Sequence, residues 1–313
     1  MRRVSVSIIG PGALGTLFAA RIAKSGAPVQ LIGRNQQVLD SINASGITFE
    51  VEGEIDTIGV RACSIEQADT TDLCIFFTKA QDLMIAAESV VTRMPSAHLV
   101  TMQNGLGHGQ RLSAIAREPS MVTHGVTMVP ADLRGVGNVE THGQAKSWLG
   151  PFVQEGLSSA TEVVDLLCSA GFFVELTNEP DVKIWNKACF NVAMNGLCAL
   201  VNGSPGLLEE FADGKRLAHE IADEVIRVGL AEGVQVSADD VHGLIDMACA
   251  NHTYHKPSMV QDLQQSRLTE IDALNGFVSD RAKQHGLLVP KTTMIYRLVK
   301  LRERSPEFWA SQD

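Results

Sequence analysis

One short run near the start of the chain constrains the fold more than any other segment. It has the spacing GxGxxG and reads Gly10-Pro11-Gly12-Ala13-Leu14-Gly15. A β-branched run at 4–9 precedes it, a helical pattern covers 14–25, and a second strand-like run follows at 28–32. A strand, a glycine turn, a helix and a second strand in this order form a right-handed βαβ unit. The sequence therefore predicts such a unit over residues 4–32.

The glycine turn itself predicts a dinucleotide site. In this motif the first glycine permits the tight turn, the second lets the backbone approach a pyrophosphate, and the third lets the helix pack closely on the strand. The N-terminus of the helix adds partial positive charge. The motif alone is weak, but here it follows a strand and opens a helix that leads to a second strand. We therefore expect Gly10–Gly15 to bind a dinucleotide.

The residues after the second strand discriminate between the two nicotinamide cofactors. An NAD-binding chain usually places Asp or Glu there, where it accepts a hydrogen bond from the ribose. This chain has Gly33-Arg34 instead. A guanidinium can bind a 2′-phosphate bidentately, so the sequence predicts NADP(H) rather than NAD. The alternative is that Arg34 is a solvated loop residue.

The remaining pattern predicts an α/β fold in two domains. Strand-like segments at 73–77, 99–102 and 120–129 alternate with helical stretches, which indicates a parallel sheet covered on both faces. Residues 137–149 look extended and predict a hairpin that closes this sheet. From Asp181 onward we find only helical patterns, at 181–200, 217–232, 238–250, 259–285 and 290–303. We therefore expect an N-terminal Rossmann-type domain (1–178) and a C-terminal all-helical domain (179–313).

Composition excludes two classes of partner. The chain has 36 acidic and 26 basic residues, a formal charge of −10, and this balance argues against binding to nucleic-acid phosphates. No apolar run approaches the roughly 18 residues that a membrane span needs. The six cysteines form no CxxC pair, which favours reduced thiols. We expect a cytoplasmic protein that binds neither nucleic acid nor membrane.

A polar stripe lies on an otherwise apolar helix in the second half. Lys187, Asn191 and Asn195 recur every four residues, so they share one face. Buried lysine and asparagine are costly when unpaired, which favours a substrate pocket with Lys187 as general acid. Partial desolvation would lower the pKa of that lysine. Spacing alone also allows Lys183, one turn earlier, and an exposed stripe on a surface helix is the alternative.

Other polar residues of this half fit structural roles. Ser258 and Gln261 have the spacing of a capping box, and Glu270 and Asp272 suit the solvated face of a long helix. His252, His255 and His242 could be considered for a metal, but two ligands on a helix end make a weak site, and we predict none.

Taken together, these motifs resemble the ketopantoate reductase (2-dehydropantoate 2-reductase) family over nearly the whole chain. The shared pieces are GPGALG at 10–15, Arg34, TKA at 78–80, QNG at 103–105, THG and WLG within 141–150, WNK at 185–187 with Asn191 and Asn195, and SMVQD through TEIDALNG at 258–276.

The resemblance implies an NADPH-dependent reduction of a 2-keto acid, ketopantoate, to a 2-hydroxy acid on the way to pantothenate and coenzyme A. It implies that Lys187 is the proton donor and that Asn104, Asn191, Asn195 and Ser258 contact the substrate. It places Arg34 and Lys79 near the 2′-phosphate, and Asn104 and Glu270 where cofactor and substrate meet. A homodimer is also expected. Three alternatives stay open: a reductase of another 2-keto acid, an opine-type dehydrogenase, and a non-catalytic NADP(H)-binding sensor.

Overall fold

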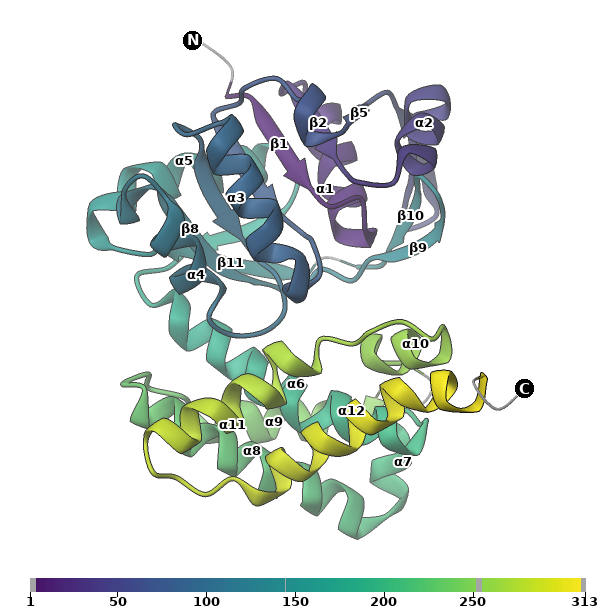
Figure 1. Ribbon diagram of the computed structural model, residues 1–313, viewed down its shortest axis with the longest axis vertical. Helices are drawn as coiled ribbons and strands as arrows, with labels where there is room; N and C mark the ends of the chain where they lie inside the picture. The colour runs from purple at the N-terminus through teal and green to yellow at the C-terminus, as the bar shows by residue number, and fades with distance from the viewer. Residues whose placement is uncertain (1–3, 144, 252–254, 311–313) are drawn as a thin grey trace. The chain divides into compact units, whose positions relative to one another are not determined.

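The computed structural model describes residues 4–143, 145–251 and 255–310. Backbone contacts divide the chain into two compact units (Figure 1). Unit 1 comprises residues 1–103 and 107–180, and unit 2 comprises 104–106 and 181–313. The change from α/β to helical structure thus falls at residue 180, and a three-residue segment of the first half belongs to the helical unit.

Unit 1 is built on an eight-stranded, mainly parallel sheet. The order of its strands is β12-β11-β8-β7-β6-β1-β2-β5, and only the pair β8 and β11 is antiparallel. The bounds are β1 (Val6–Ile9), β2 (Val29–Ile32), β5 (Arg61–Cys63), β6 (Leu73–Phe76), β7 (His98–Thr101), β8 (Val122–Thr127), β11 (Lys146–Pro151) and β12 (Phe173–Leu176). The predicted βαβ unit is present, with β1 and β2 paired in parallel.

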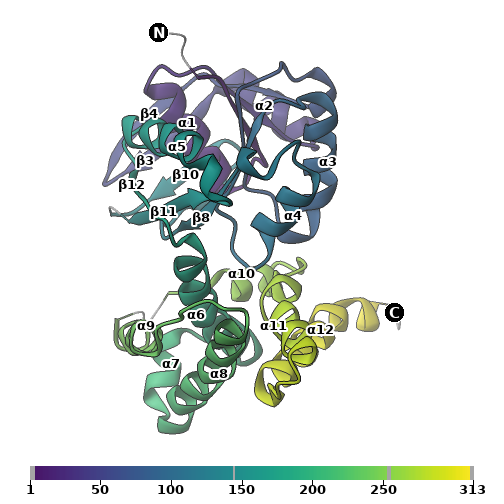
Figure 2. The ribbon, with the colours of Figure 1, turned by 90° about the vertical axis from the view of Figure 1, so that its left-hand side faces the viewer.

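Helices cover both faces of this sheet. Figure 2 shows α1 (Ala13–Lys24) and α5 (Leu157–Ser169) on one side, and α3 (Leu83–Arg93) and α4 (His108–Ile115) on the other. Alternate residues of β1 explain the arrangement, because Val6 and Ile8 pack in the core beneath α1 and α5 while Ile9 packs beneath α3 and α4. The strands therefore have apolar side chains in both directions, as strands of a covered parallel sheet do.

The predicted hairpin over 137–149 is wrong. Its first half is β10 (Asn138–Thr141), which joins a separate four-stranded sheet of order β4-β3-β10-β9 with β3 (Ile47–Val51), β4 (Glu54–Ile58) and β9 (Asp132–Gly135). Its second half is β11, which pairs with β8 in the main sheet. Alternation of side chains predicts a strand but not its partner, and β10 pairs in parallel with β3, some ninety residues earlier in the chain.

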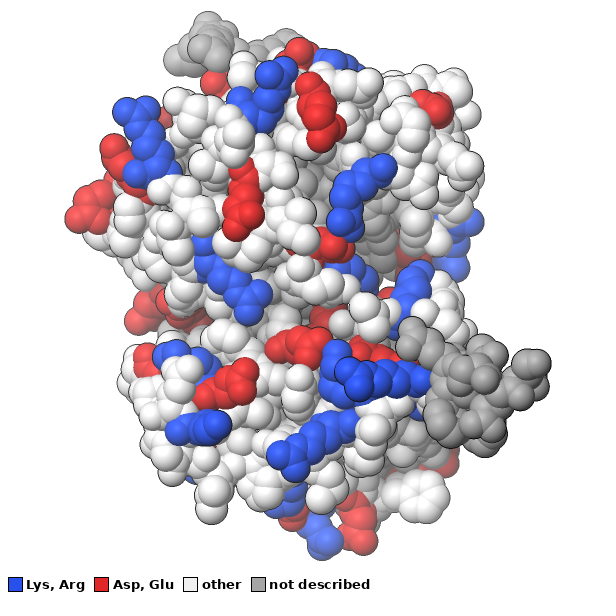
Figure 3. Space-filling model, viewed as in Figure 1, with Lys and Arg blue, Asp and Glu red and all other residues white. Residues whose placement is uncertain are grey.

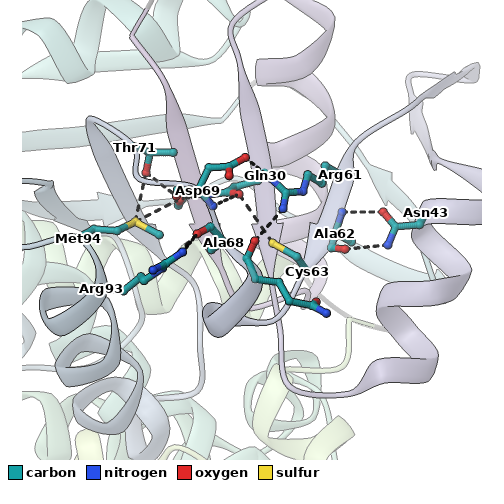
Figure 4. Close-up of polar contacts among 12 residues, drawn as sticks. Gln30, Asn43, Arg61, Ala62, Cys63, Ala68, Asp69, Thr71, Arg93 and Met94 are labelled. Carbon is teal, nitrogen blue, oxygen red and sulfur yellow. Dashed lines mark hydrogen bonds and ion pairs between the residues drawn. The ribbon is translucent and has the colours of Figure 1, made fainter.

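A buried amide joins parts of the main sheet near its β5 edge (Figure 4). Gln30 on β2 donates from Nε2 to Ser7 Oγ (2.9 Å) and to the Asp69 carbonyl (2.7 Å). Its Oε1 accepts from the Asp69 N–H at 3.1 Å. Because the side chain is only 4% exposed, these bonds satisfy an amide that would otherwise be costly to bury. They join β2 to the segment that connects β5 with β6.

The described residues of unit 2 form helices and connecting loops, and none of them lies in a strand. Its helices are α6 (Pro180–Val201), α7 (Pro205–Glu210), α8 (Ala212–Ala231), α9 (Ala238–Asn251), α10 (Ser258–Gln264), α11 (Asn275–Gln284) and α12 (Pro290–Ala310). The single helix expected over 259–285 is wrong, since α10 ends at Gln264 and α11 begins at Asn275. Ser266 lies in the left-handed region (φ 51°) and the Arg267 N–H bonds back to the Asp262 carbonyl at 2.8 Å, which closes α10.

Three further observations bear on the expectations from composition. None of the helices in the described part of the chain is long and apolar enough to span a bilayer. All six cysteines are free thiols, and only Cys168 is exposed. The face in Figure 3 carries Lys and Arg side chains interspersed with Asp and Glu.

Candidate active site

The glycine turn joins β1 to α1, and two of its glycines are required by packing. Gly10 has φ +108°, and a Cβ there would lie 2.9 Å from the backbone of Phe77 and Thr78. A Cβ on Gly15 would lie 1.9 Å from the Gly10 carbonyl oxygen. These two positions therefore bring α1 close to its strand, whatever ligand is bound.

Gly12 differs from these two, because a Cβ there would meet no atom within 4 Å. It is the N-cap of α1, provides no side-chain hydrogen bond to the helix, and no acidic residue lies in the first turn. The N-terminus of α1 thus has open space above it and backbone N–H groups that no capping side chain of the described residues satisfies. This arrangement fits the pyrophosphate of a dinucleotide.

Arg34 and Lys79 follow strands that flank β1 on either side. Arg34 comes two residues after β2, and Lys79 comes three residues after β6. Because the three strands are parallel neighbours, their carboxyl ends meet at one edge of the sheet, with the glycine turn in the middle. Arg34 is paired with Asp82, its Nη2 lying 2.9 Å from Asp82 Oδ1. The sequence analysis did not predict a role for Asp82, although this acidic residue lies only three positions after Lys79.

The residues of the QNG segment (103–105) belong to different units and have different contacts. Gln103 is buried, and its Nε2 donates to the carbonyl and hydroxyl oxygens of Thr78, so it links two loops of unit 1. Asn104 begins the short segment that belongs to unit 2. There the Leu106 N–H donates to the Ala273 carbonyl at 3.1 Å. Since Ala273 lies three residues after Glu270, the structure brings the segment of Asn104 against the segment of Glu270.

The polar stripe of α6 is present as predicted from its spacing, and it is partly buried. The opposite faces of α6 pack in the unit 2 core through residues such as Trp185, Cys189 and Val192. Asn191 is 7% exposed and Asn195 is 9% exposed. Neither side-chain amide forms a hydrogen bond to another described residue. A buried amide without a protein partner must be satisfied by water or by a ligand, so this face of α6 is suited to bind polar groups.

Lys187 is half-buried on the same face. Burial lowers the pKa of its ammonium group to about 8, and the negative charge of Glu270 acts in the opposite direction. The structure therefore places Glu270 within electrostatic reach of Lys187, although 83 residues separate them in the sequence. This carboxylate lies in the loop between α10 and α11, not on the solvated face of a long helix.

The capping box expected at Ser258 is wrong. The N-cap of α10 is Pro257, and Ser258 is the exposed first residue of the helix. Gln261 Nε2 donates to the Lys256 carbonyl at 3.0 Å, and Pro257 at the N-cap has no N–H from which the Gln261 side chain could accept a hydrogen bond. Pro257 occupies the position that the serine would have needed, so the capping role does not account for the Ser258 hydroxyl.

One of the histidines considered for a metal, His242, has partners of another kind. His242 Nε2 lies 2.9 Å from Asp223 Oδ1, and its ring stacks on His219. His252 lies outside the described residues. Among those that the structure describes, no group of three or more His, Cys, Asp or Glu side chains could hold a metal ion.

A GxGxxG turn on a parallel sheet, combined with a lysine–asparagine helix near a glutamate, is typical of dinucleotide-dependent oxidoreductases with a helical second domain. Sequence comparison agrees. Residues 6–154 match the family described as ketopantoate reductase PanE/ApbA, and residues 181–303 match its C-terminal part. The chain belongs to the ketopantoate reductase family.

Individual relatives support this assignment. The chain is 31% identical over 302 residues to the 2-dehydropantoate 2-reductase of Streptococcus pyogenes serotype M3, covering 95% of this chain and 97% of that protein. The ternary structure of D-mandelate dehydrogenase with NADH and anilino(oxo)acetate superposes with a TM-score of 0.91 at 26% identity, covering 96% and 99% of the two chains. The ketopantoate reductase of Ralstonia eutropha JMP134 gives 0.89 at 28% identity, covering 97% and 99%.

Proposed function

We propose that this protein reduces 2-dehydropantoate to pantoate with NADPH, in the cytoplasm, as a step toward pantothenate and coenzyme A. The observation that carries the proposal is the face of α6. There a lysine with a lowered pKa shares one stripe with two buried asparagine amides that have no partner among the described residues. A polar substrate with a carbonyl needs both a proton donor and hydrogen-bonding amides.

The residues of unit 1 fit the cofactor. The pyrophosphate would lie on the turn of Gly10, Pro11, Gly12, Ala13, Leu14 and Gly15, where the helix N-terminus is open. Arg34 and Lys79 would hold the 2′-phosphate at the same edge of the sheet. The resemblance to the family assigns Asn104 and Glu270, which belong to unit 2, to contacts with the nicotinamide and the substrate. A reduced nicotinamide, when bound, supplies the hydride.

The chain's own chemistry is then the transfer of one proton. The carbonyl carbon accepts the hydride while the carbonyl oxygen accepts a proton from Lys187 Nζ, and the neutral amine regains a proton from solvent. Negative charge develops on that oxygen only as the reaction proceeds, so an ammonium aimed at it stabilises the transition state more than the ground state. Asn191, Asn195 and Ser258 would hold the polar groups of the substrate.

A second candidate is the reduction of a different 2-keto acid. The observation that favours it is the similarity to D-mandelate dehydrogenase, whose structure holds NADH and anilino(oxo)acetate. Different residues around the part of the substrate beyond the keto acid group would change which 2-keto acid the protein accepts, while proton transfer from the lysine stays the same.

Initial rates of NADPH oxidation test both candidates. We would compare 2-dehydropantoate with phenylglyoxylate and 2-oxoisovalerate, with NADH as the cofactor control. A kcat/KM for 2-dehydropantoate well above the others supports the first candidate. Activity only on another keto acid supports the second. Binding of NADPH without turnover of any keto acid would contradict both and favour a sensor.

A homodimer is part of the proposal. Met294, Leu298 and Leu301 lie on one face of α12 and are exposed by 61%, 42% and 67%. Large apolar side chains that share an exposed face favour association. Sedimentation velocity of the whole protein should give a dimer, and Leu298→Glu should shift it toward monomer; a monomeric wild-type protein would contradict this.

A further inference from the structure

The ion pair between Arg34 and Asp82 bears on the choice of cofactor. Arg34 follows β2, and Asp82 is the last residue of a short 3-10 helix (Ala80–Asp82) that precedes α3. The pair therefore connects the segment after β2 with the segment after β6, on the two sides of β1. The Arg34 side chain is 75% exposed and that of Asp82 is 29% exposed. Asp82 is also the N-cap of α3 but forms no side-chain hydrogen bond to that helix. Its carboxylate therefore serves Arg34 rather than the helix.

We propose that Asp82 sets the balance between NADPH and NADH by competing with the 2′-phosphate for Arg34. This inference rests on the proposed function, in which Arg34 binds that phosphate. A phosphate that reaches the guanidinium comes next to a carboxylate already bound to it, so like charges share one cation. A ribose with a free 2′-hydroxyl meets no such repulsion, and the carboxylate can accept its hydrogen bond. Asp82 thus weakens NADPH binding and permits NADH.

Asp82→Asn tests the competition without a loss of fold. An exposed ion pair contributes little to stability, and the side chain caps no helix. We would measure calorimetric binding of 2′,5′-ADP and 5′-AMP, which differ only in the 2′-phosphate, together with kcat/KM for NADPH and NADH. We expect Asp82→Asn to tighten binding of 2′,5′-ADP by roughly 3- to 10-fold, because one like charge is removed near the surface. Binding of 5′-AMP should stay the same or weaken.

Glu88→Gln is the matched control. Glu88 is exposed on α3, and its substitution removes the same charge one to two helical turns beyond Asp82. It should leave the ratio of the two affinities unchanged. An equal effect of both variants would mean that net charge alone acts, and would overturn the inference. The inference would also be overturned if Asp82→Asn bound 2′,5′-ADP with unchanged affinity. Weaker binding would overturn it too, because it would mean that Asp82 holds Arg34 in place for the phosphate.

Arg34→Ala separates this inference from the proposed function. It should abolish the preference for 2′,5′-ADP over 5′-AMP. If it does so while Asp82→Asn has no effect, the competition by Asp82 fails and the role of Arg34 stands. If Arg34→Ala leaves the preference intact, the proposed 2′-phosphate site is wrong, and the inference fails with it.

Discussion

At the scale of single residues, two opposing effects set the pKa of Lys187, the general acid that we propose. Removing an ammonium group from water disfavours its charged form, which lowers the pKa of Lys187 to about 8. Glu270 favours the charged form and keeps the pKa from falling further. The result is a group that is mostly protonated at pH 7 yet releases its proton more readily than an exposed lysine does.

Lys187→Ala should lower kcat by about 10²- to 10⁴-fold, the usual contribution of a positioned general acid. Binding of NADPH, measured by fluorescence titration, should change little, because the lost interaction belongs to the transition state. Lys183→Ala is the matched control, one turn earlier on α6, and should retain most of the activity. The reverse outcome, with Lys183 essential and Lys187 dispensable, would show that Lys183 and not Lys187 is the proton donor.

The rate of reduction should also depend on pH in a defined direction. The donor must be protonated, so kcat/KM should be level below the pKa of Lys187 and fall as pH rises through about 8. Glu270→Gln removes the charge that raises this pKa, so the fall should move to lower pH. A profile whose fall stays in place in Glu270→Gln would contradict the coupling between the two residues.

At the scale of secondary-structure elements, α1 begins with an N-cap that makes no side-chain hydrogen bond and has open space beside it. Gly12 provides no capping side chain, and space lies above it. Gly12→Ser should supply a capping hydroxyl and raise the free energy of unfolding by a few tenths of a kcal/mol. The same hydroxyl would accept from the N–H groups that we propose bind the pyrophosphate, so NADPH affinity should fall by about 10-fold.

Gly15→Ala provides the contrast to this prediction. The Cβ of the alanine would lie 1.9 Å from the Gly10 carbonyl oxygen. The substitution should therefore lower the free energy of unfolding by about 1–3 kcal/mol and weaken cofactor binding as well. Urea unfolding and fluorescence titration of both variants measure the two effects. If Gly12→Ser bound NADPH as tightly as the wild type, the open N-terminus of α1 would not be the pyrophosphate site.

The elements also show what the sequence could and could not predict. The βαβ unit and the stripe on α6 depend on local spacing, and both are present in the structure. The loop between α10 and α11 is held in part by a distant residue. Glu303 Oε1 accepts from both the backbone N–H and the hydroxyl of Thr269, at 2.8 and 2.7 Å, across 34 residues. Helical periodicity does not contain such a contact, so the loop that carries Glu270 could not be predicted.

At the scale of the whole molecule, each unit has its own hydrophobic core. The buried clusters of unit 1 draw on its sheet and the helices that cover it, whereas the cluster of unit 2 draws on residues of all its helices from α6 to α12 together with Leu106. A unit with its own core can unfold as a cooperative unit. Ligand binding to one unit should therefore stabilise that unit selectively.

Native-state hydrogen exchange with 2′,5′-ADP tests this expectation. At 100 times its dissociation constant, a ligand that binds only the folded state adds about 2.7 kcal/mol to the free energy of unfolding. Amides of β1 and β6 that exchange only by unfolding should therefore slow by roughly 100-fold. Amides at the centre of α8, around Val225, should not change. In the Arg34→Ala variant, the same concentration of 2′,5′-ADP should give much less protection against exchange, because the variant binds this ligand more weakly. Equal slowing in both units would show instead that the two cores unfold together, since linkage then stabilises the whole chain.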